Sequence, residues 1–177
     1  MATQNNEASY GWPAKALHWG MALLIISLVA LGLYLSGMPR GDAKSELIRL
    51  HASSGVLAFM LLLVRFGWKL CQPGPRPLSD IKWQVVLSKL VHWAFYAVIA
   101  AQVISGSLSL MTVGWDVPFF GLFAIPTPYE RDMALHHYWE GWHVAAWYAL
   151  ASLFALHMGA VLFHQLVGKK RILKRML

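Results

Sequence analysis

Apolar residues gather in four long stretches of the chain, at residues 16–36, 50–70, 90–111 and 143–166. A membrane-spanning helix needs about 20 mostly apolar residues, and each stretch reaches that length. The connections 37–49 and 71–89 are short, and the second is too rich in proline and glycine to continue a helix. The pattern therefore predicts an all-α membrane protein, one domain over residues 1–177, folded as a four-helix up-and-down bundle.

The third connection, residues 112–142, is aromatic and interrupted by prolines, and we expect it to fold back onto the outer membrane surface. Residues 1–15 lack the basic region, apolar core and small-residue cleavage site of a cleavable signal, so we expect the first stretch to stay in the bundle.

Composition and charge place this bundle in a membrane with both termini in the cytoplasm. The chain is 58% hydrophobic and 13% charged, whereas about 25% of residues are charged in soluble domains. Eleven Lys and Arg flank the inner ends of the stretches and four flank the outer ends, and this bias sets orientation. We therefore attribute the net charge of +7 to topology and lipid contact, not to nucleic-acid binding. The single Cys71 excludes an intrachain disulfide and a thiolate cluster.

Two of the eight histidines, His143 and His157, lie fourteen residues apart in the last stretch. At 3.6 residues per turn both imidazoles face one side of the helix, and they lie about 21 Å apart along its axis. This places one near each edge of a bilayer core about 30 Å thick. An imidazole facing the interior of a membrane bundle is costly unless it is held, most commonly by a metal. The spacing therefore predicts two metal centres at two depths.

Other histidines match these two depths. His51 opens the second stretch on the outer side and pairs with His143 in our prediction. His18 lies at the inner depth of His157, but His92 in the third stretch has a similar depth and could replace it. His164 lies two turns beyond His157 at the inner interface, where it could handle protons. We interpret His136 and His137 as surface residues of the outer loop.

Ligands in separated pairs, with no Asp or Glu in the four stretches, favour haem over zinc. Without a CxxCH motif such haems would be held non-covalently, as b-type. Small residues beside the histidines, such as Gly20, Gly55 and Gly159, leave room for a macrocycle, although ordinary helix packing also uses them. Arg65 and Arg49 could pair with haem propionates, or could simply extend to the interface.

The chain resembles the bacterial cytochrome b561 family over nearly its whole length. The matching motifs are ALHWG at 16–20, LHASSG at 50–55, LVHW at 90–93, WH at 142–143, ALH at 155–157 and LFH at 162–164. The resemblance implies a protein of the bacterial inner membrane with two b haems. It implies an inner haem held by His18 and His157, rather than His92, and an outer haem held by His51 and His143.

Within that family the chain looks most similar to stand-alone members that act as superoxide oxidase, passing electrons from outer superoxide to ubiquinone. On this interpretation Arg40, Lys44, Arg49 and Arg131 form a positive rim that steers superoxide. His164, with His92 and Lys15, would form a quinone pocket on the inner side. The alternatives are an electron-relay subunit for a periplasmic dehydrogenase of the hydrogenase type and a His-lined metal or proton transporter. The chain is also compatible with a homodimer.

Overall fold

The computed structural model describes residues 3–77, 79–168 and 172–177. Its long elements are four helices, α1 (Trp12–Gly37), α2 (Asp42–Cys71), α3 (Lys82–Met111) and α4 (Met133–Leu162). A π-helical turn η1 (Phe163–Val167) and a short 3₁₀ turn η2 (Leu173–Arg175) follow α4. All four helices are long and apolar enough to cross a membrane, so the predicted fold class is confirmed. Three of the inner basic residues, Lys169, Lys170 and Arg171, lie outside the described residues.

All four helices begin earlier than the hydrophobic pattern predicted, α1 by four residues, α2 and α3 by eight and α4 by ten. α4 starts at Met133, not at residue 143, because Asp132 caps it by accepting hydrogen bonds of 2.9 Å from the amides of Ala134 and Leu135. His136 and His137 therefore lie on α4, and their assignment to the outer loop was wrong. α3 likewise starts at Lys82, not at residue 90, because the sequence between Pro77 and residue 90 contains no proline or glycine to break the helix. Hydrophobicity marks the part of a helix in lipid, but the helix itself continues until the backbone is broken.

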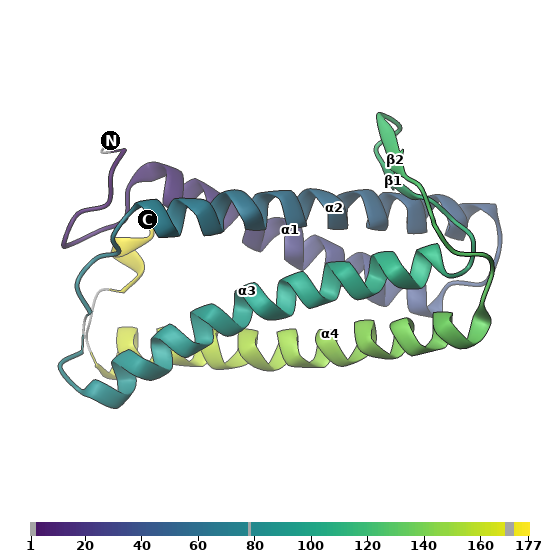
Figure 1. The fold of residues 1–177 in the computed structure, drawn as a ribbon. Coiled ribbons are helices and arrows are strands. Elements are labelled where there is room, and N and C mark those ends of the chain that lie inside the picture. The colour runs from purple at the N-terminus through teal and green to yellow at the C-terminus, as the bar shows by residue number, and fades with distance from the viewer. Residues whose placement is uncertain (1–2, 78, 169–171) are drawn as a thin grey trace.

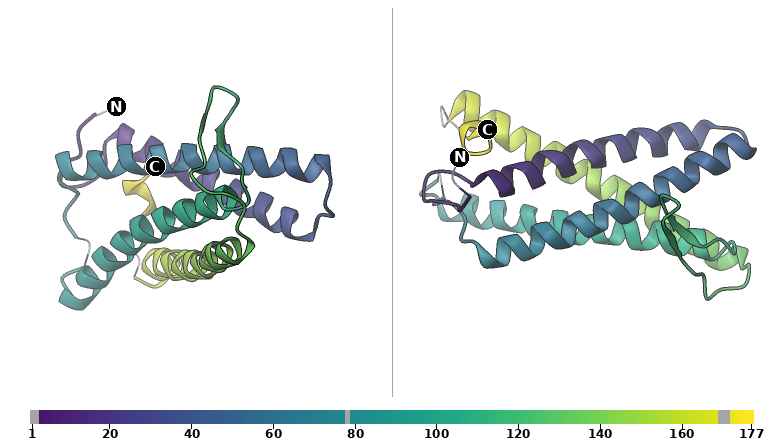
Figure 2. Two further views of the ribbon diagram at one scale, coloured as in Figure 1. Left: turned by 45° about the vertical axis from the view of Figure 1, so that its right-hand side comes forward. Right: turned by 90° about the horizontal axis from the view of Figure 1, so that it is seen from above.

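The helices form two antiparallel pairs, with α1 against α2 and α3 against α4, joined by contacts between α2 and α3 (Figure 1). The two pairs cross when seen from above (Figure 2). Both chain ends lie at one end of the bundle, as the predicted orientation requires, and the connection between α3 and α4 lies at the other. We call these the inner and outer ends. α4 packs along α3 and makes few backbone contacts with α1 or α2.

The buried core is a thin layer halfway along the bundle. It contains one residue from each helix: Met21, Leu62, Ile99 and Leu150. Leu150 lies seven residues from both His143 and His157, so this apolar layer separates the two histidine levels. Elsewhere large apolar side chains such as Leu23 and Leu63 face outward, which suits a surface covered by lipid.

The outer connection carries a small hairpin, β1 (Val117–Phe119) paired antiparallel with β2 (Phe123–Ile125). Its turn places Phe120 and Gly121 at positive φ, of 48° and 74°. The hairpin folds back against α2, where the buried Ser53 hydroxyl lies 3.1 Å from the Pro118 carbonyl and accepts a 3.1 Å hydrogen bond from the Phe120 amide. Ser53 thus fixes the hairpin to the outer half of α2.

Replacing Ser53 with alanine should loosen the hairpin without unfolding the bundle. The change removes the hydrogen bond between the Ser53 hydroxyl and the Phe120 amide, which costs about 0.5–1.5 kcal/mol. Amide hydrogen exchange of residues 117–125 should therefore become faster. The control is Ser45→Ala, which removes a hydroxyl that donates only to the nearby Gly41 carbonyl, and it should leave exchange of the hairpin unchanged. Equal protection in both variants would show that Ser53 does not hold the hairpin.

Candidate metal centres

The outer histidine pair joins α2 to α4. The rings of His51 and His143 have centroids 6.3 Å apart and planes at 80°. Nδ1 of His143 lies 2.8 Å from the Gln102 carbonyl, which can only accept, so Nδ1 carries the proton and Nε2 keeps its lone pair. Nδ1 of His51 is buried and has no hydrogen-bond partner. Both rings are thus held in the bundle with a nitrogen available as a metal ligand.

Gln102 of α3 controls His143 in two ways. Its carbonyl fixes the tautomer, and its side-chain nitrogen lies 3.2 Å from Nε2 of His143, where it donates a hydrogen bond. Nε2 is the atom that would bind a metal, so the Gln102 side chain has to turn away for ligation. The sequence offered a signal for this residue, because a polar side chain within an apolar stretch is rare and commonly functional.

At the inner level the structure brings three histidines together. The rings of His18 and His157 have centroids 6.4 Å apart with planes at 75°, and those of His92 and His157 have centroids 6.1 Å apart with planes at 65°. Arg65 of α2 lies within electrostatic range of all three rings. Distance alone therefore does not choose between His18 and His92 as the partner of His157.

The ring separations fit one metal ion between two imidazoles. A metal–nitrogen bond is about 2.0 Å long, and the nitrogen of a five-membered ring with bonds of about 1.33 Å lies about 1.1 Å from the centroid. Two imidazoles bound in line on opposite sides of one ion thus have centroids about 6.2 Å apart. Ordinary aromatic contacts also include this distance. The recurrence of the same separation at two depths, fourteen residues apart on α4, is what favours metal ligation.

Glycines of two neighbouring helices, Gly106 of α3 and Gly32 of α1, lie close to the rings of the outer histidine pair. A Cβ atom on Gly106 would lie 2.8 Å from Cε1 and Nδ1 of His143, closer than real side chains allow, and one on Gly32 would lie 3.4 Å from Cε1 of His51. Glycine is therefore needed at position 106 for His143 to adopt its position. By contrast, Gly20, Gly55 and Gly159 have open space around them and no packing neighbour within 4 Å.

The four residues of the predicted positive rim all lie at the outer end but not in one cluster. Lys44 donates a 2.8 Å hydrogen bond to the Met38 carbonyl, and Arg49 stacks over Trp115 with its guanidinium carbon 5.1 Å from the ring centroid. Arg40 is exposed in the same corner between α1 and α2. Arg131 is exposed in the connection, two residues before α4 begins.

Acidic residues outnumber basic ones at this end. The six acids are Asp42, Glu46, Asp116, Glu130, Asp132 and Glu140, against the four bases Arg40, Lys44, Arg49 and Arg131. With neutral histidines the outer end has a net charge of −2. Only the corner between α1 and α2 is locally positive, because four of the six acids belong to the connection before α4 or to the start of α4.

The three residues of the predicted quinone pocket occupy different surroundings. Lys15 donates a 3.0 Å hydrogen bond to the carbonyl of Leu177, and His92 lies beside His157. His164 is half-buried in the π-helical turn η1, beside Phe163. No hydrogen bond or ring contact joins these three side chains in the part of the chain that the structure describes. Lys15 does line a surface hollow of about 340 Å³ together with Trp19 and Leu177.

Comparison with known proteins agrees with these features. The family model described as prokaryotic cytochrome b561 matches residues 9–177. The chain is also 30% identical, over 185 residues, to the Escherichia coli (strain K12) protein named cytochrome b561 homolog 2. That alignment covers 100% of this chain and 95% of the relative.

Proposed function

This chain belongs to the prokaryotic cytochrome b561 family, and we propose that it carries electrons across the inner membrane from superoxide at the outer face to ubiquinone at the inner face. Membership makes it a multi-pass bacterial membrane cytochrome that transfers electrons and contains b-type haem. It also argues against a His-lined transporter, as does the apolar layer of Met21, Leu62, Ile99 and Leu150, which lies between the two histidine levels.

In this proposal His51 and His143 hold an outer haem, and His18 and His157 hold an inner one. The observation that carries it is a ring separation that occurs twice. The centroids lie 6.3 Å apart for His51 of α2 and His143 of α4, and 6.4 Å apart for His18 of α1 and His157 of α4. Apart from these pairs, α4 makes few contacts with α1 or α2. A flat macrocycle needs such a space. α3 and α4 pack along their length, which leaves less room between His92 and His157, so His18 is the better ligand.

When bound, two haems would supply two one-electron stores for outer-sphere electron transfer. The side chains around them fix their positions and charge. Arg65, within electrostatic range of His18 and His157, is placed to neutralise propionates of the inner haem. Arg49, two residues before His51, is placed to do the same at the outer level.

On the inner side we assign quinone to the hollows along the first turns of α1. One, of about 350 Å³, lies between Trp12 and Gly20 of α1 and Leu61 of α2, and the second includes Lys15. Their volumes lie at the lower end of the range for ligand sites, about 300–1,000 Å³. His164 supplies protons from the cytoplasmic side, and its place in a π-helical turn suits this role, because such turns are frequent at functional sites.

The reaction balances with superoxide as the reductant. Two superoxide ions each lose one electron and become dioxygen, and one quinone takes up those two electrons with two protons and becomes quinol. The locally positive corner of Arg40, Lys44 and Arg49 supports attraction of the anion. The net charge of −2 over the whole outer end opposes it.

Stopped-flow mixing of the oxidised, purified protein with superoxide tests this function. Rapid haem reduction, followed by quinol formation when a soluble quinone is present, is the expected result. Arg40→Gln with Lys44→Gln should slow reduction about tenfold at low salt, because steering raises association rates by about 10–10³. Lys89→Gln, which removes an exposed charge from the inner half of α3, should not. Haem that stays oxidised would refute superoxide as the donor.

The surface of the outer end also favours a second candidate, an electron-relay subunit that docks a periplasmic dehydrogenase. The hairpin exposes apolar side chains, with Leu122 77%, Phe123 51% and Ile125 42% accessible. An apolar, net acidic surface fits a protein partner better than a small anion. A cytochrome that is inert to superoxide but is reduced by a periplasmic protein fraction would support this function.

A further inference from the structure

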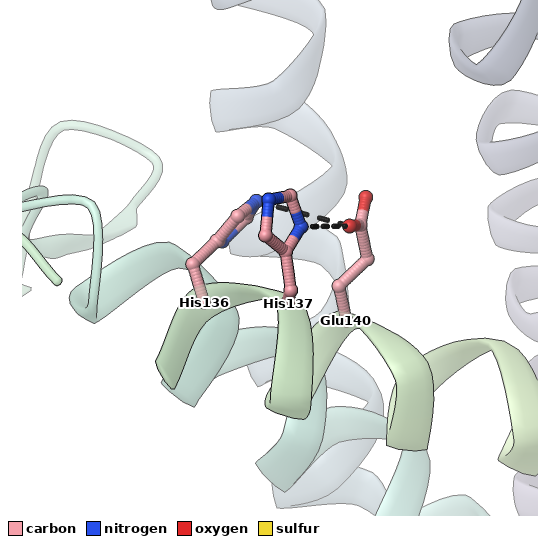
Figure 3. A group of neighbouring side chains, drawn as sticks. All are labelled: His136, His137 and Glu140. Carbon is pink, nitrogen blue, oxygen red and sulfur yellow. Dashed lines mark hydrogen bonds and ion pairs between the residues drawn. The ribbon is translucent and has the colours of Figure 1, made fainter. Parts of the chain in front are cut away.

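A second group of metal-ligating side chains lies on the first turns of α4, apart from the four proposed haem ligands. His136, His137 and Glu140 point toward one another, as Figure 3 shows. Nδ1 of His137 lies 3.3 Å from Oε2 of Glu140, and Nε2 of His136 lies 4.0 Å from the same oxygen. One ligand atom from each residue lies within 4.8 Å of the other two. A single ion could therefore contact all three after small rotamer changes.

His136 is held in the way that metal-binding histidines usually are. Its Nδ1 lies 2.9 Å from the Ser109 carbonyl of α3 and 3.1 Å from the Ser109 hydroxyl. Because a carbonyl can only accept, Nδ1 carries the proton and Nε2, which faces Glu140, keeps its lone pair. A backbone carbonyl bound to the other ring nitrogen is the common outer-shell partner of a ligating histidine. The neighbouring helix thus fixes this imidazole in a ligating tautomer.

The surroundings attract a cation and allow it to reach the site. The side chain of His136 is 21% exposed, whereas those of His137 and Glu140 are 68% and 55% exposed, so one ligand is fixed and two are accessible. The outer end has a net charge of −2, and Asp132 at the N-cap offsets the positive end of the helix dipole.

We propose that His136, His137 and Glu140 bind one divalent transition-metal ion of the Cu²⁺ or Zn²⁺ class at the outer face. Two imidazoles and one carboxylate are a ligand set that such ions prefer, and they leave a coordination position for water. The site does not depend on the identity of the electron donor. A bound dication would offset the net charge of −2 at the outer end. It would lie beside Glu140, about one helical turn before the proposed haem ligand His143.

Metal titration of the purified, haem-loaded protein, produced without a polyhistidine tag, tests the site. Calorimetry with Zn²⁺ should show one saturable site per chain. The exposed residues allow safe variants, and His137→Ala or Glu140→Gln should weaken binding at least tenfold, because even an outer-shell partner contributes about 10–100-fold. Glu46→Gln, which removes an exposed acid from α2 at the same end, should bind as the wild type does.

Electron paramagnetic resonance of bound Cu²⁺ provides a second readout. Hyperfine structure from two nitrogens is expected in the wild type and from one nitrogen in His137→Ala. The proposal is wrong if the wild type shows no saturable binding, or if the two ligand variants bind Zn²⁺ as tightly as Glu46→Gln does. In that case His137 and Glu140 form only a surface ion pair.

Discussion

Replacing His157 with alanine removes the inner haem and leaves the outer haem in place. The change deletes the imidazole that lies 6.4 Å, between ring centroids, from His18, while His143 keeps its hydrogen bond to the Gln102 carbonyl. The apolar layer at Leu150 separates the two levels, so the loss should not spread. Haem content per chain should fall by half, and one of the two low-spin components of the absorption spectrum should disappear.

The matched variants make this result specific. His143→Ala should remove the other component, and His164→Ala, seven residues beyond His157 on the same helix, should keep both haems. His92→Ala should also keep both, because α4 packs along α3 but makes few contacts with α1, so the space for a macrocycle lies toward His18. Loss of the inner haem in His92→Ala, with retention in His18→Ala, would show that His92 is the ligand.

Replacing Gly106 with alanine should disable the outer haem site without touching a ligand. The new Cβ atom would lie 2.8 Å from two atoms of the His143 ring. The ring cannot easily retreat, because its Nδ1 is bound to the Gln102 carbonyl at 2.8 Å. Overpacking of this kind costs about 1–3 kcal/mol, which corresponds to about 5- to 150-fold weaker haem binding. Haem titration of the apoprotein, resolved by the two spectral components, measures the change.

Gly67→Ala is the matched control, because nothing lies within 4 Å of a Cβ atom at that glycine of α2. It should keep wild-type affinity for both haems. An outer component that binds equally well in Gly106→Ala and Gly67→Ala would mean that His143 moves freely and that the close approach of α3 has no role.

The sequence predicted the bundle and the approximate spans because lipid imposes long apolar stretches, and these are visible without tertiary information. It also predicted which histidines share a depth, because helical rise converts sequence separation into distance. Depth could not separate His18 from His92, which lie at the same level on different helices. That distinction depends on which helices pack closely, which sequence separation does not encode.

The beginning of α4 was misplaced because His136, His137, Glu140 and Gly141 interrupt the apolar pattern of its first ten residues, although Asp132 caps them as a helix. This error hid the group of His136, His137 and Glu140, which share a face only if the segment is helical. The charge at the outer end was misjudged for a different reason. The orientation rule counts Lys and Arg alone, whereas a field at the surface depends on Asp and Glu as well.

The central claim is that two pairs of histidines hold two haems in one chain. A pyridine haemochrome assay, combined with amino-acid analysis of the fully loaded protein, measures the number of haems per polypeptide directly. The account predicts two non-covalent b haems for each chain. A saturated value of one haem per chain, or of none, would contradict it.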